Sequence, residues 1–141
     1  MNLVELNPVG NFDPWNPVKL NELKNIRCLK TLGQRLFFEN ETMRFWEICL
    51  QPKERLVFHK RSQYYSWTCH TDGLLISRYE NGQILMLRFE KDETKYWDLG
   101  ESGTVADLEN IGEHTLVLHM IEYKQQVMKA TNNSPSLNID N

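Results

Sequence analysis

The sequence predicts an all-β domain, either a sandwich or a barrel, and three observations support this prediction. From residue 34 onward, short apolar or alternating runs follow one another at close spacing, as the strands of an antiparallel sheet do. Turn-forming residues separate the runs, and Asn81-Gly82 between two of them is the strongest short-range hairpin pattern. Nothing alternates strands with long helical segments, which argues against a parallel α/β sheet.

Composition and charge narrow the class of protein. The chain has 141 residues, of which 40% are apolar and 25% charged, as expected for one soluble domain with a single core. Its net charge of -3 argues against nucleic acid or an anionic membrane as a partner, since either would favour a basic face. No apolar run could span a bilayer, and the N-terminus lacks the basic and apolar regions of a secretory signal. We therefore expect a cytoplasmic protein.

Residues 1–33 are expected to form an N-terminal arm and a first strand region packed on a barrel. The prolines in residues 7–17 remove ladder donors and restrict their neighbours, so this segment predicts an extended arm or loop. Phe12 and Trp15 are too apolar for a free tail, and we expect them either to anchor the arm on the domain or to reach a second subunit. Residues 18–29 fit helical and strand spacing, and we favour one helical turn followed by a strand.

Residues 34–125 are expected to form the β-barrel. The runs that predict its strands are residues 34–38, 43–50, 55–61, 64–70, 74–79, 84–89, 94–99, 104–110 and 115–123. The polar residues 126–141 predict a disordered tail.

The cysteines predict neither a disulfide framework nor a zinc site. Cys28, Cys49 and Cys69 are odd in number and widely spaced, and no CxxC pair occurs. Cys49 and Cys69 each lie in an apolar strand pattern, so we expect small buried hydrophobic residues in a reducing compartment.

Polar residues and turns between residues 52 and 73 follow a known order. After Pro52 come Lys53, His59, Arg61, Ser66 and Gly73. This order resembles the first motif of the cupin family, G-x5-H-x-H, three or four residues, E, six residues, G. In that frame Lys53 stands for the opening glycine, His59 for the first histidine, Arg61 for the second, Ser66 for the glutamate and Gly73 for the closing glycine.

A second stretch has the spacing of the family's other motif. Gly103, Ala106 and Asn110 match its ending, G-x2-H-x3-N, with Ala106 in the place of the histidine, and Lys91 and Trp97 fall where an earlier glycine and proline stand. The resemblance covers about residues 42–123. It implies a single-domain, RmlC-like jelly-roll β-barrel.

The resemblance also implies that the family's metal site is mostly lost. Metal-binding cupins use the three motif histidines and the glutamate as ligands, and only His59 remains here. An arginine cannot be deprotonated to act as a ligand, alanine has no donor atom, and a serine hydroxyl is a poor neutral ligand. We therefore expect no metal and no other cofactor. A replacement site from His59 with His70, or from His59 with Glu47, stays open, although no third ligand is identifiable.

Strand alternation predicts which side chains enter the barrel. Val57, His59 and Arg61 are expected to point inward, as are Ser66, Thr68 and His70, with Tyr64 at the mouth and Trp67 and Cys69 outward. The predicted ligand-binding residues are therefore His59, Arg61, Tyr64, Ser66, Thr68 and His70.

The charge of Arg61 indicates the kind of ligand. A guanidinium matches a carboxylate or a phosphate bidentately, so we expect a small anionic molecule. The alternative is that Arg61 pairs with Glu47 and that the cluster is structural. His119 is expected to be a satisfied strand histidine, and His114 is expected to be solvated.

Three functional hypotheses follow. The first is a non-catalytic protein that binds a small molecule in the barrel. The second is a metal-independent enzyme, similar to the epimerase, isomerase or cyclase members of the superfamily, with His59 or His70 as general base and Tyr64 as acid. No His–Asp pairing supports that base. The third is a structural subunit whose Trp46, Trp67 and proline-rich arm form a dimer interface. A homodimer is expected from the family tendency and from exposed aromatic residues.

Overall fold

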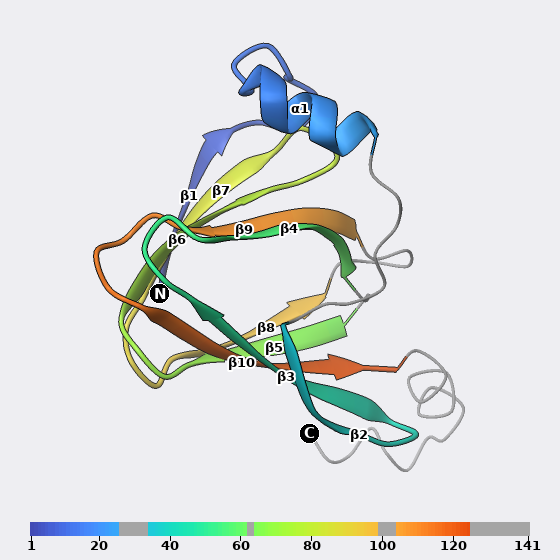
Figure 1. Cartoon of the computed structure of the whole chain (residues 1–141), viewed down its shortest axis with the longest axis vertical. Coiled ribbons are helices and arrows are strands. Elements are labelled where there is room, and N and C mark those ends of the chain that lie inside the picture. The colour runs from blue at the N-terminus through green and yellow to red at the C-terminus, as the bar shows by residue number, and fades with distance from the viewer. Residues whose placement is uncertain (26–33, 62–63, 99–103, 125–141) are drawn as a thin grey trace.

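The computed structural model describes residues 1–25, 34–61, 64–98 and 104–124. Two five-stranded sheets face each other, with strand orders β1-β7-β6-β9-β4 and β2-β3-β10-β5-β8, and every pairing in them is antiparallel (Figure 1). The predicted all-β jelly-roll architecture is confirmed. No helix of the described segments is long and apolar enough to cross a membrane.

The elements have the following bounds: β1 (Asn2–Asn7), α1 (Pro17–Lys24), β2 (Arg35–Glu39), β3 (Met43–Leu50), β4 (Arg55–Arg61), β5 (Tyr64–Cys69), β6 (Gly73–Arg78), β7 (Ile84–Phe89), β8 (Thr94–Asp98), β9 (Thr104–Asn110) and β10 (Leu116–Tyr123). Strand β1 was not expected from the sequence. It pairs with β7 at the edge of the first sheet.

The core lies between the inner faces of the two sheets. Alternation in β10 shows how the faces divide, because Leu116, Leu118 and Met120 are fully buried while the residues between them are partly exposed. The same pattern in the other strands collects a continuous apolar cluster that includes Ile48, Leu50, Leu75, Leu87 and Leu108. Burying this surface drives the two sheets together.

The turns place left-handed backbone at three informative positions. Lys53 has φ 73°, so the residue that stands for the motif's opening glycine adopts the conformation that glycine adopts most easily. Asp92, next to the second landmark Lys91, has φ 72°. The predicted hairpin between β6 and β7 is confirmed, but only Gly82 of its central pair has a positive φ, 95°, so the turn is not type I′.

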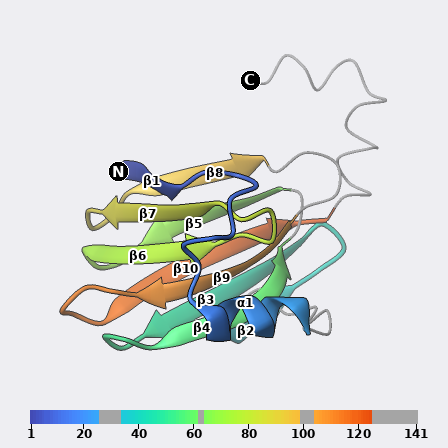
Figure 2. The same cartoon turned by 90° about the horizontal axis from the view of Figure 1, so that it is seen from above.

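The N-terminal arm is docked on the outer side of the first sheet. Trp15 is buried, its ring stacks on Phe58 of β4 at 6.2 Å between centroids, and its indole donates to the Gly82 carbonyl at 2.8 Å. The prediction that Trp15 anchors the arm on the domain is confirmed. Helix α1 follows, begins at its N-cap Asn16, and overlies the β4 side of the sheet (Figure 2).

Two predictions fall outside the described residues. The strand expected after the helical turn lies largely in residues 26–33, and the expected disordered tail lies in residues 126–141. The helix itself has eight residues, longer than the single turn expected.

Candidate functional site

A β-bulge in β4 sets the direction of His59 and Arg61. The strand holds one residue more than β9 between two pairs of their register, Leu56↔Leu108 and His59↔Ala106. Because of this extra residue, Val57 is exposed and Phe58 packs under the arm, while His59 and Arg61 are buried. The expectation that Val57 points inward is wrong. Arg61 reaches the interior, since its guanidinium lies over the ring of the core residue Trp67 at 5.5 Å.

Strand β5 faces the opposite way from the prediction. Its fully buried side chains are Tyr65, Trp67 and Cys69. Ser66 and Thr68 are partly exposed on the outer face and His70 is exposed, so the expectation that these three point inward is wrong. The error arose because β4 and β5 belong to different sheets, and alternation does not carry over between them. The apolar alternation within β5 itself would have indicated the correct face.

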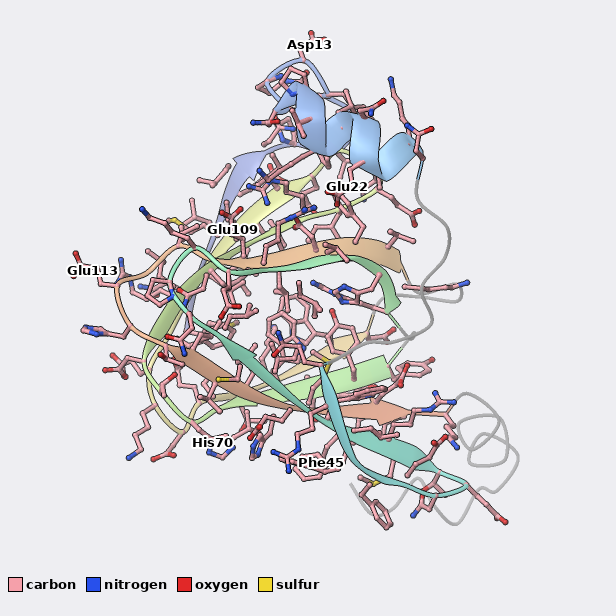
Figure 3. All side chains as sticks on the ribbon, in the orientation of Figure 1. Asp13, Glu22, Phe45, His70, Glu109 and Glu113 are labelled. Atoms are coloured by element: carbon pink, nitrogen blue, oxygen red, sulfur yellow. The ribbon has the colours of Figure 1, made fainter. Side chains whose placement is uncertain are left out.

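The outer face of the second sheet gathers a different set of polar residues. The ring of His70 lies 3.9 Å from that of His119, and His119 Nε2 lies 3.1 Å from Glu47 Oε2. Figure 3 shows His70 on the side of this sheet turned away from the other sheet. His59 lies inside the barrel, so neither of the replacement metal pairs considered from the sequence comes together.

The distribution of side chains between the inner and outer faces of the sheets tests three more expectations from the sequence. Tyr64 lies on the outer side and stacks on Tyr96 at 6.5 Å between centroids. Cys49 is exposed rather than buried, whereas Cys69 is buried as expected, and burial raises the pKa of its thiol to about 12. Trp46, like Trp67, is buried in the core and cannot form a dimer interface. The homodimer stays a prediction that needs other contact residues.

Arg61 is the centre of the buried polar cluster. The side chain is fully buried, and all of its nitrogens face hydrogen-bond acceptors. Its partners are His59 Nε2 at 3.4 Å, Tyr65 Oη at 3.4 Å, Tyr79 Oη at 3.3 Å, Ser77 Oγ at 2.9 Å and the Asp107 carbonyl at 2.8 Å. Burial lowers the pKa of this guanidinium, but the neighbouring tyrosines and Asp107 outweigh burial and leave the pKa above its ordinary value.

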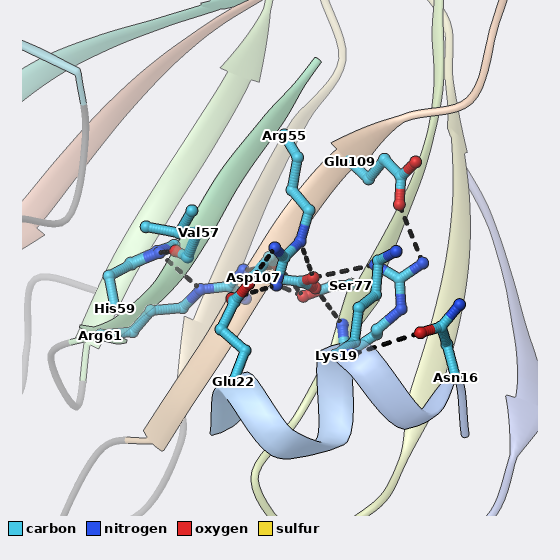
Figure 4. Close-up of polar contacts among 11 residues, drawn as sticks. Asn16, Lys19, Glu22, Arg55, Val57, His59, Arg61, Ser77, Asp107 and Glu109 are labelled. Atoms are coloured by element: carbon cyan, nitrogen blue, oxygen red, sulfur yellow. Dashed lines mark hydrogen bonds and ion pairs between the residues drawn. The ribbon is translucent and has the colours of Figure 1, made fainter. Parts of the chain in front are cut away.

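No carboxylate of the described residues forms an ion pair with Arg61. Glu47, the partner considered from the sequence, pairs with His119 instead, so that expectation is wrong. The carboxylate of Asp107 is engaged by Arg55 at 2.7 Å and by Arg78 at 2.8 Å. Figure 4 shows Arg55 and Asp107 beside α1, where Glu22 of the helix also reaches Arg55. Among the residues that the structure describes, only neutral oxygen and nitrogen atoms therefore hydrogen-bond to the guanidinium of Arg61.

His59 is held as a neutral imidazole. Its Nδ1 lies 2.7 Å from the Val57 carbonyl, which can only accept, so Nδ1 carries the proton and Nε2 faces Arg61 as an acceptor. Burial, and then the charge of Arg61, lower the pKa of His59 to about 3. An imidazole with this pKa is a weak general base at neutral pH.

Two indoles complete the cluster. The Nε1 atoms of Trp67 and Trp97 are buried, and neither has a hydrogen-bond partner within the described segments. The two rings are 5.2 Å apart, and Tyr65 stacks on Trp97 at 6.0 Å. None of four residues of this cluster was predicted from the sequence: Tyr65, Ser77, Tyr79 and Trp97. The register Tyr65↔Trp97 brings β8 to the site, and a register cannot be deduced from one sequence.

The donor set does not suit the metal of the cupin family. His59 turns its free nitrogen toward a cation, Ala106 opposite it has no donor, and Ser66 lies on the outer face. Within the described ranges, no three histidine, cysteine, aspartate or glutamate side chains could hold a metal ion together. The arrangement favours a negatively charged group, since a divalent cation would meet the charge of Arg61.

An open surface cleft lies apart from this cluster. Its volume is about 600 Å³, and its lining combines both charge signs: Asp72, Gly73, Leu74, Arg88, Phe89, Glu90, Ile111, Gly112, Glu113 and His114. His114 is exposed there, as expected. None of the buried polar residues around Arg61 belongs to this cleft.

No protein-family model matches the chain. No curated protein sequence matches it either. Solved structures do resemble it. A cupin domain from Bordetella pertussis Tohama I is 17% identical, covers 70% of this chain and 98% of its own, and gives a TM-score of 0.57.

Two further structures agree. An RmlC-like cupin family protein with a double-stranded β-helix fold from Methanocaldococcus jannaschii is 14% identical, covers 74% of this chain and 91% of its own, and gives a TM-score of 0.53. An uncharacterised protein with a double-stranded β-helix domain from Klebsiella pneumoniae covers 71% and 84%, with 14% identity and a TM-score of 0.51. At these identities the likeness concerns the fold.

Proposed function

The chain has the cupin fold, and we propose that it binds a small oxyanion, a carboxylate or a phosphate, inside the barrel beside Arg61. The observation that carries the proposal is the fully buried guanidinium, which has no ion-pair partner among the described carboxylates. Binding a ligand, rather than catalysis, is the proposed activity.

The cost of burying an unpaired charge supports a ligand. Transfer of an ion into a protein interior costs several kcal/mol even after relaxation, and neutral hydrogen-bond partners offset only part of this cost. The other two arginines of the network, Arg55 and Arg78, each contact carboxylates directly. Arg61 differs from them in lying on the inner face. An oxyanion that enters the barrel would give Arg61 the charged partner that the other two already have.

The cluster does not assemble the groups of an acid–base enzyme. His70 and Tyr64 lie on the outer face, so neither shares the interior with His59. His59 itself accepts from Arg61 through the nitrogen that a base would use. The residues present can hold and neutralise an anion, and this is the function that their geometry favours.

Calorimetric titration tests the proposal. Sodium benzoate and disodium phenylphosphate are the probes, and at least one is expected to show saturable, one-to-one binding to the full chain. Arg61→Met should weaken that binding by about tenfold or more, which corresponds to about 1.4 kcal/mol. Arg88→Met serves as the control, because Arg88 is an exposed arginine of β7 outside the barrel interior.

Either of two results would overturn the proposal. The first is that neither probe binds the wild-type chain, a measurement that does not depend on any variant. The second is that folded Arg61→Met binds as tightly as the wild type. Circular dichroism establishes folding. If Arg61→Met does not fold, Arg61→Lys keeps a charge without the guanidinium fork and should still weaken binding.

A further inference from the structure

We infer that the ligand of this site is a singly charged carboxylate on an apolar, flat body, with no hydrogen-bond donor on the end that meets the cluster. The inference rests on the proposed function and narrows it. Its support is the balance of donors, acceptors and charge around Arg61.

The donors of the cluster outnumber its acceptors. Ser77 donates to the Asp107 carbonyl at 2.6 Å, and His59 donates to the Val57 carbonyl. Arg61 donates to five acceptors, and the carbonyl among them also accepts from Ser77: His59 Nε2, Tyr65 Oη, Tyr79 Oη, Ser77 Oγ and the Asp107 carbonyl.

Two donors then remain without a partner in the described part of the chain, the indole N–H groups of Trp67 and Trp97. The hydroxyls of Tyr65 and Tyr79 accept from Arg61, so each can still donate its own proton to a ligand. Tyr65 keeps its proton, since burial raises the pKa of its phenol to about 12. Buried donors of native proteins are nearly always paired. The missing acceptors are therefore expected on the ligand, and a ligand that brings donors would add to the excess.

Charge selects between the two kinds of oxyanion. Arg61 is a fully buried cation, whereas the Lys95 ammonium, 5.3 Å from the Trp97 ring centroid, belongs to a partly exposed residue. The buried carboxylates Asp107 and Glu122 already pair with other arginines, Asp107 with Arg55 and Arg78, and Glu122 with Arg44. The buried guanidinium can therefore neutralise one negative charge. A carboxylate would leave the buried pair neutral. A phosphate monoester dianion would leave one negative charge in the interior, which is costly. The site should accordingly prefer a carboxylate.

The walls of the cluster indicate the body of the ligand. Tyr65, Trp67 and Trp97 form a group of rings with centroids 5.2 to 6.0 Å apart, on the inner faces of β5 and β8. Such rings are flat and apolar, with the N–H groups at their edges. They pack on one another and on Phe89, so a ligand has to insert among them. A planar apolar body suits that position while its carboxylate reaches Arg61.

A panel of four ligands that share one ring tests the inference. Benzoate, phenylphosphate, benzamide and benzylamine are titrated into the full chain at pH 7.5 by calorimetry. Benzoate should bind at least about tenfold more tightly than phenylphosphate, and benzamide and benzylamine should show no saturable binding. Trp97→Phe, which removes one free indole N–H and keeps a ring, should weaken benzoate about fivefold. Trp15→Phe is the matched control, because the Trp15 indole already donates to Gly82.

The possible results distinguish a failure of the carboxylate preference from a failure of oxyanion binding itself. Phenylphosphate binding as well as or better than benzoate would overturn the carboxylate class and leave oxyanion binding intact. Benzoate binding that Trp97→Phe leaves unchanged would overturn the role of the unpaired donors. If no anion binds, or if benzylamine binds in preference to both anions, the inference and the proposed function fall together.

Discussion

Among the single residues, His59 shows how the charge of Arg61 keeps a neighbouring group of the cluster neutral. Its imidazole is buried beside a guanidinium, so the protonated form would place two positive charges together in the interior. The neutral form instead accepts a hydrogen bond from Arg61. His59 therefore supports the arginine as a hydrogen-bond acceptor.

This arrangement predicts that stability falls as the pH is lowered. The pKa of His59 is about 3 in the folded chain and near 6.5 when unfolded, so between these values the unfolded chain binds the extra proton. The free energy of unfolding should drop by about 2 kcal/mol at this site between pH 7 and pH 5. Urea unfolding at both pH values measures the difference.

Two variants isolate this effect from other titrations. His59→Asn, which cannot take up a proton, should flatten the loss over this pH range. His114→Asn removes an exposed histidine and should keep the wild-type slope. Equal slopes in His59→Asn and the wild type would contradict a buried neutral His59. The comparison stops at pH 5. The pKa values of Glu22, Glu39 and Glu93 are lowered in the folded chain, so the stability that these carboxylates contribute is lost mainly below that pH.

The sequence predicted the most informative residue of the site and missed most of its neighbours. Arg61 was expected inside, and it is buried, although the alternation used to place it overlooked the bulge that turns Val57 outward. Bulges depend on strand pairing, so one sequence does not show them. Ser77 lies in β6, Tyr79 follows that strand, and Trp97 of β8 reaches the cluster through Tyr65, so tertiary structure determines their approach.

At the scale of elements, the arm and α1 form part of the folded domain. Asn7 of β1 donates to the Gly82 carbonyl at 2.8 Å, and Trp15 donates to the same oxygen. Glu22 of α1 makes two hydrogen bonds to Arg55, at 2.9 and 2.7 Å, and Arg55 continues to Asp107. The arm is therefore linked to Arg61 through Glu22, Arg55 and Asp107, because the Asp107 carbonyl accepts a hydrogen bond from Arg61.

Removing the Trp15 side chain should destabilise the whole domain. Trp15→Ala deletes a buried ring and the bond to Gly82, and should lower the free energy of unfolding by about 3 kcal/mol. Trp15→Phe keeps a ring against Phe58 and should cost about 1 kcal/mol. Urea unfolding followed by circular dichroism measures both. A Trp15→Ala variant as stable as the wild type would show that the arm does not pack on the barrel in solution.

Several elements were predictable because their local chemistry is specific. The β6–β7 hairpin follows from Asn81-Gly82, and Asn110 of the second motif proves structural, since its amide bonds the carbonyls of Leu50 and His114. Strand β1 was missed, because Asn2–Asn7 alternates too weakly to separate it from the arm and pairs only through a distant partner, β7.

At the scale of the whole molecule, the two sheets differ in what covers their outer faces. The β1-β7-β6-β9-β4 sheet carries the ionic network and the docked arm, while the other sheet carries His70, His119 and several aromatic residues (Figures 1 and 3). Between them the core is mostly apolar, and its buried polar residues include the cluster around Arg61, Glu122 on the inner face of β10 and Asn110. The all-β class was predictable from periodicity, but the assignment of β4 and β5 to different sheets was not, and the wrong facing of β5 followed from that.

If the indole N–H groups of Trp67 and Trp97 donate to an oxyanion bound at Arg61, their NMR signals must respond to it, and the four tryptophans of the chain allow this to be measured directly. With ¹⁵N-labelled tryptophan, the indole N–H resonances are followed by NMR while benzoate is added to saturation. Trp15 and Trp46 already donate, to Gly82 and Glu122, and serve as internal controls. We expect the indole protons of Trp67 and Trp97 to shift downfield and those of Trp15 and Trp46 to stay unchanged. Four unchanged resonances, or shifts confined to Trp15 and Trp46, would contradict it.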